Sequence, residues 1–381
     1  MTQDSRLKTL NSYDLLYQVA LPLIPRVGGG NARTLVQALG SPEKVFGASL
    51  ESLSKVHRIG EVFAKSILSH KSAALKQAEQ IILRAEKEDV QLLYYTNPAY
   101  PGRLRDVPDA PLLLYYKGNA DLNAQKVISI VGTRKSTDYG QKVTEQLVSD
   151  LVKHEALVVS GLAYGIDIIA HRAALKEGLP TVGVMANSLE TIYPFAHTQD
   201  AKKMLEQGGL LSEFPFGTKP DAPRFPSRNR IIAGMADCTI VVESTESGGS
   251  LISADIAHSY DREVMAVPGP ITSETSEGTN QLIKSLKAVP YTKFKDLEEL
   301  LNWDKALAGP SVPKALPKRD FSGFPEDEQK ILKLLQHAGP THIDVLSRNT
   351  DFSMGQLSSV LFTLEMSGQI KAMPGKLYGL L

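Results

Sequence analysis

The amino-acid sequence predicts an α/β protein with a Rossmann-like parallel sheet core, an N-terminal helical domain and a C-terminal winged-helix domain. Three patterns indicate this organisation: glycine turns before amphipathic helices near the start, alternating strands and helices in the middle, and three helices followed by a hairpin at the end. At 381 residues the chain is too long for one ordinary domain.

Residues 1–85 have the pattern of a small helical domain. Two stretches, RVGGGNARTLVQALG (26–40) and VHRIGEVFAKSILSH (56–70), each place a glycine turn before an amphipathic helix. They resemble a pair of helix-hairpin-helix (SAM-like) motifs, which offer backbone amides to phosphates in other proteins. Any αα-hairpin produces a similar spacing. A DNA contact by this domain therefore remains one of two alternatives, beside a purely structural bundle.

The central region, residues 86–303, alternates short apolar strands with helix patterns such as YGQKVTEQLVSDLVKH and SLISADIAHSYD. Near-continuous apolar strands separated by helices imply a parallel sheet covered on both faces. Sheets of this kind bind ligands in the crevice beyond the carboxyl ends of their strands. The expected strands are 127–131, 156–160, 181–185, 209–214, 238–243 and 263–269.

The C-terminal region begins with a linker. Residues 304–322 are rich in Pro, Ala and Lys, a composition typical of linkers. Residues 323–381 then show three helix patterns and a terminal hairpin, which is the outline of a winged helix. The net charge of residues 320–381 is about −2, which argues against tight DNA binding and favours contact with a protein partner.

Composition excludes several classes of protein. The chain has 42 basic and 42 acidic residues, so any site for a polyanion must be a local concentration of charge. No apolar run has the length of a membrane span, and the N-terminus lacks the pattern of a secretory signal. The single cysteine, Cys238, lies in an apolar strand pattern and is expected to be a core residue in a reducing compartment. We therefore expect a cytoplasmic protein.

Loops rich in Gly, Ser and Thr follow four of the expected strands. They are GTRKS (132–136), SGLAYGID (160–167), ESTESGGSLIS (243–253) and PGPITSETSEGTN (268–280). Small residues let backbone N–H groups approach an anion, and the helix starts that follow add partial positive charge. Four such loops at one sheet edge predict an anion site. Because neither G-x-G-x-x-G nor G-x-x-x-x-G-K-[ST] is present, no dinucleotide or Walker-type nucleotide cofactor is expected.

An arginine cluster precedes the strand at 238–243. Within seven residues the chain carries Arg224, Arg228 and Arg230. Three classes of partner suit such a cluster: a mononucleotide, a nucleic acid backbone or neighbouring carboxylates. The carboxylates expected near this sheet edge are Asp237, Glu243 and Glu213, and for one of the last two arginines we expect an internal pairing with them.

These motifs together resemble the DNA-processing protein A (DprA, also called Smf) family, closely over residues 90–290. The segments that carry the resemblance, in order, are VGTRKSTDYG, SGLAYGIDIIAHRAAL, YP at 193–194, LLSEFPFG, FPSRNRIIAG, SGGSLISADIA, REVMAVPGP and GTNQLI. One departure is that the family usually shows a Gly-Ala pair where this chain has Leu286 and Lys287. The resemblance implies a single-stranded DNA-binding protein of natural transformation (competence) and DNA recombination. It also implies a homodimer through the central domain that protects incoming strands and helps load the RecA recombinase.

The resemblance also implies the site residues. Arg134 of the G-[ST]-R loop and Arg224 are the candidates for phosphate, because a guanidinium binds two phosphate oxygens at once. Phe225 is the candidate for base stacking, with core packing beside Pro226 as the alternative. The full set of expected DNA-binding residues is Gly132, Thr133, Arg134, Ser160, Gly161, Gly165, Arg224, Phe225, Arg228, Asn229, Arg230, Ser247, Gly248, Gly249 and Ser250.

Rival functions have weaker support. A nucleotide phosphoribohydrolase would carry a P-G-G-x-G-T-x-x-E loop, whereas the corresponding loop here reads ESGGSLISADIA. A scaffold protein without a DNA pocket differs from the favoured hypothesis only in what the central cleft holds. A metal site is not expected, since Asp167 and His171 share a helix face without a third ligand, and Asp167 fits a helix-start residue better. No catalysis is expected.

Overall fold

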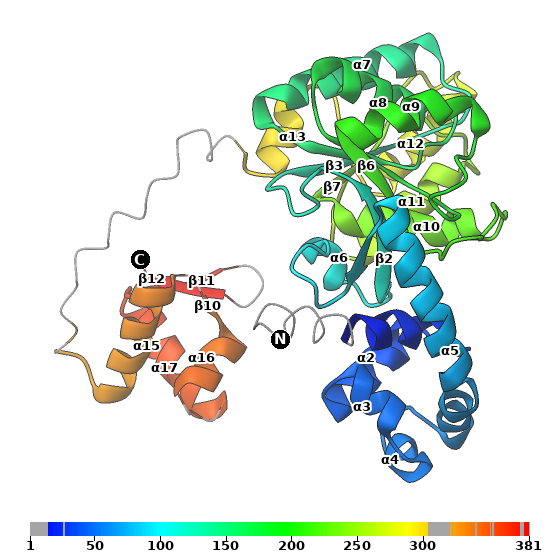
Figure 1. Cartoon of the computed structure of the whole chain (residues 1–381). Coiled ribbons are helices and arrows are strands. Elements are labelled where there is room, and N and C mark those ends of the chain that lie inside the picture. The colour runs from blue at the N-terminus through cyan, green and yellow to red at the C-terminus, as the bar shows by residue number, and fades with distance from the viewer. Residues whose placement is uncertain are drawn as a thin grey trace. The chain divides into compact units, whose positions relative to one another are not determined.

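The computed structural model describes residues 14–25, 27–303, 321, 323–339, 341–350, 352, 354–373 and 377–380. The chain forms two compact units that divide between Asn302 and Trp303 (Figure 1). Most of the expected linker, residues 304–320 and 322, lies outside the described residues. Phe321 is described and is buried in the core of the C-terminal unit.

A nine-stranded sheet forms the centre of the first unit, in the order β1-β2-β6-β5-β4-β3-β7-β8-β9. The six predicted strands are confirmed, all pair in parallel, and almost every residue in them is buried. The residue type explains this, because β-branched and other apolar side chains fill both faces of a covered parallel sheet. Their bounds are β3 (Val127–Val131), β4 (Leu157–Ser160), β5 (Thr181–Val184), β6 (Gly208–Ser212), β7 (Cys238–Val241) and β8 (Glu263–Ala266).

Three further strands extend this sheet beyond the prediction. On one side β2 (Leu113–Gly118) pairs antiparallel with β6, and β1 (Gln91–Tyr94) pairs antiparallel with β2. On the other side the short β9 (Val289–Pro290) pairs in parallel with β8. Neither β1 nor β2 belongs to a strand–helix–strand repeat, so the pattern that revealed the parallel strands does not extend to them.

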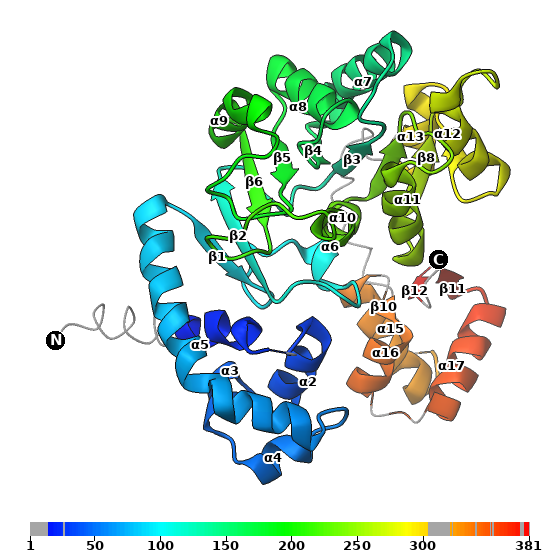
Figure 2. The same cartoon turned by 90° about the vertical axis from the view of Figure 1, so that its right-hand side faces the viewer.

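Helices cover both faces of the sheet (Figures 1 and 2). Helices α7 to α9 lie on one face, and α10 and α11 on the other. The chain runs from β3 to β4 on one side and later enters β7 on the other side of β3, so the loops after β3 and β7 diverge and leave a crevice. The helices are α7 (Asp138–Leu151), α8 (Ile166–Glu177), α9 (Thr198–Glu206), α10 (Arg224–Met235), α11 (Gly249–Ser259), α12 (Glu274–Lys284) and α13 (Phe294–Leu300), with the short α6 (Gly102–Arg105) before β2.

The N-terminal helices belong to the same compact unit as the sheet. Their bounds are 14–20, η1 (Leu21–Leu23), α2 (Gly29–Leu39), α3 (Pro42–Gly47), α4 (Leu50–Ser54) and α5 (Glu61–Glu88). Helix α5 continues past the expected domain boundary at residue 85. Its buried side chains, with those of α2 and α3, form one apolar core with Tyr94 and Tyr115 of the sheet.

The first of the two hairpin-like glycine turns packs against its own chain. A methyl group on Gly29 would lie 2.8 Å from the carbonyl oxygen of Ala110. The guanidinium of Arg33, one turn further on, donates to the carbonyl oxygens of Arg105 and Ala110 at 3.2 and 3.3 Å. This turn therefore joins the helices to the segment from α6 to the start of β2.

The C-terminal unit is a winged helix, as predicted. Its helices and strands are α15 (Glu326–Ala338), β10 (Thr341–His342), α16 (Ile343–Thr350), α17 (Met354–Met366), β11 (Ile370–Met373) and β12 (Leu377–Leu380). The three strands form a separate sheet in the order β10-β12-β11. Within the described ranges of both units, no helix combines the length and apolar composition that crossing a bilayer requires.

Candidate functional site

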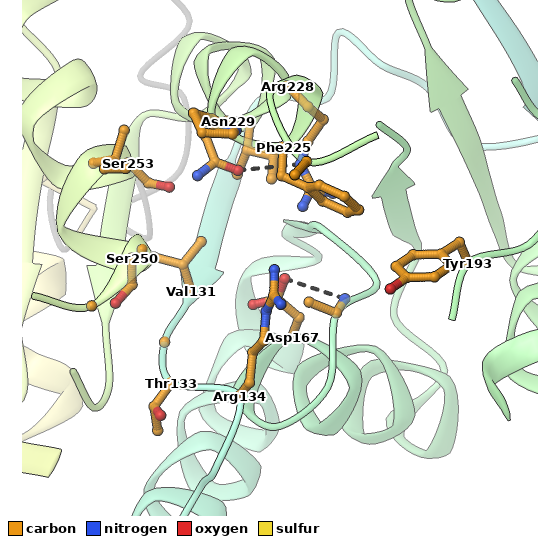
Figure 3. A pocket seen from close by; sticks show the side chains of 18 of the residues that line it. Val131, Thr133, Arg134, Asp167, Tyr193, Phe225, Arg228, Asn229, Ser250 and Ser253 are labelled. Atoms are coloured by element: carbon orange, nitrogen blue, oxygen red, sulfur yellow. Dashed lines mark hydrogen bonds between the residues drawn. The ribbon is translucent and has the colours of Figure 1, made fainter. Parts of the chain in front are cut away.

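A pocket of about 590 Å³ lies at the carboxyl ends of the parallel strands (Figure 3). Loops after β3, β4, β5, β6 and β7 and the starts of α10 and α11 contribute to it, which is the position expected for a ligand crevice in a doubly wound sheet. The predicted site residues that line it are Gly132, Thr133, Arg134, Phe225, Arg228, Asn229, Gly248, Gly249 and Ser250.

The loop that carries Arg134 is held by the buried carboxylate of Glu243. The backbone N–H and the hydroxyl of Thr137 donate to this carboxylate at 2.9 and 2.6 Å, and the hydroxyl of Thr275 donates to it at 3.2 Å. The N–H of Thr133 donates to the carbonyl oxygen of Glu243 at 2.7 Å. Glu243, expected as a possible arginine partner, thus fixes the loop after β3 to the end of β7.

Arg134 is exposed and points into the pocket (Figure 3). Its guanidinium carbon lies 5.7 Å from the centroid of the Phe225 ring, within the range of a cation–π contact. Among the described residues, no carboxylate lies within ion-pair distance of Arg134. The charge of this side chain is therefore available to a ligand.

Asp167 accepts hydrogen bonds at the start of α8, as predicted. Its Oδ2 accepts the backbone N–H groups of Gly161 and Ala163 at 3.2 and 3.4 Å. Burial raises the pKa of this carboxyl group, while the nearby Arg228 charge and the N–H donors act in the opposite direction. The carboxylate occupies the N-terminal end of α8, so this helix end already has an anion from its own chain.

Arg228 is buried beneath the pocket. It donates to the carbonyl oxygen of Gly161 at 2.6 Å and to that of Val184, and its guanidinium carbon is 6.0 Å from the Phe225 ring centroid. Burial lowers its pKa to about 10 despite the favourable charge of Asp167. Because its donors are directed at the ends of β4 and β5, Arg228 braces the loops that form the pocket.

Two of the predicted arginines lie outside the pocket lining. Arg230 pairs with Glu213, one of the carboxylates named from the sequence, and lies 3.9 Å from Asp109. Arg224, expected to bind phosphate, donates to the carbonyl oxygen of Lys219, and its guanidinium carbon is 5.5 Å from the Phe214 ring. Arg228 and Arg230 therefore both have internal partners, whereas the sequence suggested one.

The remaining predicted residues support the site without lining it. Ser160 is buried and donates to the carbonyl oxygen of Ile130 at 2.6 Å. Gly161 must lack a side chain because a methyl group there would lie 2.5 Å from the Arg228 guanidinium. Ser247 is exposed beside the lining residue Gly248.

Gly165 allows the loops after β3 and β4 to touch. Its φ is +73° and its ψ −127°, and a methyl group there would lie 2.1 Å from the carbonyl oxygen of Thr133. We expect Gly165→Ala to lower the free energy of unfolding by about 3 kcal/mol or more, from backbone strain and overpacking together. Chemical denaturation measures this loss.

Gly178 provides a control with a similar φ, in the left-handed helical region (ψ 10°). Its φ is +76°, but nothing lies within 4 Å of a methyl group placed on it. Gly178→Ala should therefore cost only about 1 kcal/mol, the strain of a left-handed backbone alone. Equal losses in the two variants would show that the contact with Thr133 does not matter.

Several lining residues were not predicted. They are Val131, Ala163, Asp167, Tyr193, Pro220, Asp221, Ala222, Pro226, Ile232, Ile252 and Ser253. Tyr193 follows β5, and its ring centroid lies 5.7 Å from that of Phe225, so the two rings form one aromatic wall. The signal for Tyr193 was the YP pair, which lies beyond the third strand at the same sheet edge. Asp221 places a carboxylate in the lining, opposite in sign to Arg134.

The histidine beside Asp167 has a structural partner. His171 is buried and its Nδ1 lies 2.7 Å from the hydroxyl of Thr181; burial lowers the pKa of this histidine to about 3. Among the residues that the structure describes, no group of three or more His, Cys, Asp and Glu side chains could hold a metal ion.

The pocket combines three features that suit a nucleotide unit. Arg134 supplies a positive charge, and the start of α11 supplies backbone N–H groups at Gly249 and Ser250 without an acidic residue in the first turn. Phe225 and Tyr193 supply flat apolar faces. Such a site can hold a phosphate at one end and a base against the other.

Comparisons with known proteins give a consistent result. A family model described as DNA recombination-mediator protein A matches residues 91–302, and one described as DprA winged helix domain matches residues 313–376. Protein Smf from Synechocystis is 30% identical over 390 residues, which covers 95% of this chain and 98% of that protein.

Two solved structures are also similar. DNA processing protein A from Streptococcus pneumoniae has a TM-score of 0.62 at 29% identity, and the match covers 77% of this chain and 97% of that one. DNA processing protein A from Helicobacter pylori, whose structure describes the single-stranded DNA binding mode of that protein, has a TM-score of 0.51 at 29% identity. That match covers 56% of this chain and 96% of the other.

Proposed function

Because this chain belongs to the DNA recombination-mediator protein A (DprA/Smf) family, we propose that it binds single-stranded DNA in the pocket at the carboxyl ends of β3 and β7. The observation that carries the proposal is an exposed, unpaired arginine next to an aromatic wall, in a pocket that the start of α11 also lines. Arg134 binds a phosphate, and Phe225 stacks a base.

The geometry of the pocket supports an unpaired strand as the ligand. A base can stack on the Phe225 ring only when it is neither paired nor stacked on the neighbouring bases. Stacking of a base on an aromatic side chain contributes roughly 1–3 kcal/mol per base. The pocket offers Arg134 for phosphate and aromatic rings for stacking, and neither kind of contact reads the edge of a base, so binding tolerates different sequences. In a duplex the bases are already stacked and paired, so we expect weaker binding.

The role of the protein in the cell is a further part of this proposal. We infer that it acts in natural transformation, where it protects incoming single strands and helps to load the RecA recombinase, as a cytoplasmic homodimer formed through the sheet domain. Joining two pockets in a dimer raises the affinity for a long strand, because binding at the second pocket becomes intramolecular. The proposal requires no chemical step by the protein.

Fluorescence anisotropy of the native full-length chain tests the proposal. The probes are a labelled single-stranded oligothymidylate of ~20 nucleotides and a duplex of the same length, over a range of salt concentrations. We expect tighter binding to the single strand, and a logarithm of affinity that falls linearly with the logarithm of salt concentration as counterions are released.

Two results would contradict the proposal. Equal affinity for the single strand and the duplex would point to a site other than this pocket, such as the N-terminal helices. No binding to either probe at low salt would remove single-stranded DNA as the ligand and favour a free nucleotide.

A further inference from the structure

Large aromatic side chains lie exposed beside the pocket. The exposed fractions are 84% for Phe195, 49% for Tyr164 and 46% for Tyr193. We call these three residues the aromatic rim. A soluble protein exposes single apolar side chains at random, but a group of aromatic rings next to a binding pocket indicates a contact surface.

The aromatic rim is continuous with the pocket. Tyr193 lines the pocket and packs against Phe225 at a ring-centroid distance of 5.7 Å, and Phe195 follows two residues later. Tyr164 is next in sequence to Ala163, which also lines the pocket. The three rings therefore belong to the loops after β4 and β5, which both contribute to the pocket.

A buried histidine holds the parts of the rim together. The Nδ1 atom of His197 donates to the carbonyl oxygen of Leu162 at 2.8 Å, which ties the segment after β5 to the loop after β4. The ring of Tyr164 packs edge-on against His197, with 4.9 Å between centroids. The exposed rings are thus placed on a fixed base, which lowers the entropy that a ligand would lose on binding them.

The charges around the rim suit a polyanion. The carboxylates that flank this segment in sequence have their own partners: Glu190 pairs with Arg84 and Asp200 with Arg172. The helix that follows the rim, α9, exposes Lys202 and Lys203. These two carboxylates are thereby neutralised, and the exposed lysines of α9 add positive charge to the same segment of the chain.

We propose that the aromatic rim is a second stacking surface for unpaired bases, which holds the nucleotides that adjoin the one in the pocket. This inference rests on the proposed function and extends it. The bases of an emerging single strand stack on Tyr193 and then on Phe195 and Tyr164, while the phosphates face the lysines of α9. A duplex offers no free base to these rings.

Substitution of Phe195 tests the rim without disturbing the fold, because this side chain is 84% exposed. Phe195→Leu keeps an apolar side chain and removes the aromatic face. We expect it to weaken binding of the labelled single strand about tenfold, within the range measured for loss of one stacked base. Phe362→Leu is the matched control: Phe362 is 65% exposed on α17 of the other unit, and its loss should change the affinity less than twofold (about the error of the measurement).

Phe195→Trp gives a direct readout of stacking. The chain has one tryptophan, Trp303, which is buried, so a tryptophan at position 195 would add a separate exposed emitter. Native-like affinity, with quenching of the new emission by oligothymidylate and recovery in high salt, is the expected result. A merely structural role of the ring would not produce this quenching.

The outcomes separate this inference from the proposed function. If Arg134→Ala weakens single-strand binding while Phe195→Leu and the emission of Phe195→Trp show no effect, the rim proposal is wrong and the pocket stands. An equal loss of single-strand affinity in Phe362→Leu also contradicts the rim proposal. If the native chain does not prefer the single strand, both proposals fail together.

Discussion

Alanine in place of Arg134 should weaken binding of the labelled single strand by roughly 10- to 100-fold, or ~1.4–2.7 kcal/mol. The physical reason is the loss of charge-assisted hydrogen bonds to phosphate from a guanidinium that points into the pocket and has no carboxylate partner among the described residues. The salt dependence should also flatten, because each lost phosphate contact removes about 0.7 from the slope for a single strand.

The neighbouring cation serves as the control for this variant. Lys135 is exposed, carries the same charge and does not line the pocket. Lys135→Ala should therefore change affinity by less than ~1 kcal/mol, as expected for a screened surface charge. Arg134→Lys should recover part of the loss, since it restores the charge without the planar fork. If Arg134→Ala and Lys135→Ala lose the same affinity, Arg134 contributes only long-range electrostatic attraction and makes no specific phosphate contact.

Replacing Arg228 with methionine should have the largest effect on stability, lowering the free energy of unfolding by about 3–5 kcal/mol at neutral pH. The substitution keeps an apolar stem but leaves the buried Asp167 carboxylate without its nearest positive charge and the carbonyl oxygens of Gly161 and Val184 without a donor. Urea denaturation measures the loss. Arg172→Met is the control, because Arg172 forms an exposed pair with Asp200 and its loss should cost no more than about 1 kcal/mol.

The same variant makes a prediction about pH. Burial already raises the pKa of Asp167 in the folded protein, and removal of the Arg228 charge raises it further. A carboxyl group whose folded pKa lies above its unfolded value binds protons more tightly in the folded state, so its contribution to stability falls as pH rises through that pKa. The difference in the free energy of unfolding between the native chain and Arg228→Met should therefore become smaller as the pH is lowered from 7 to 5.

Asp167→Asn completes the test as a double-mutant cycle. An asparagine oxygen can still accept the N–H groups of Gly161 and Ala163, while the buried charge is gone. In the Arg228→Met background it should restore part of the lost stability and abolish the pH effect. If Arg228→Met unfolds like the native chain and only loses DNA affinity, Arg228 contacts the ligand and does not brace the loops.

Most of the sheet was predictable because its strands are buried on both faces. Runs such as Val127–Val131 and Cys238–Val241 are apolar except for one small hydroxyl residue each, and helices with a clear period separate them. The loops that follow were recognisable for a related reason, since their glycines permit close approaches such as that of Gly165 to Thr133. The antiparallel β1 and β2 lacked this repeat and were not predicted.

The sequence by itself determined the fold class, predicted that four loops meet at one sheet edge, and gave Arg134, Arg224 and Phe225 as candidates for the site. Only the tertiary structure decided which arginines have a partner within the protein and which do not. Arg224, Arg228 and Arg230 lie within seven residues on α10, yet a helix turns successive side chains in different directions. One therefore reaches Lys219, one the ends of β4 and β5, and one Glu213. The sequence lists charges, but the partner of each charge depends on contacts between segments far apart in the chain.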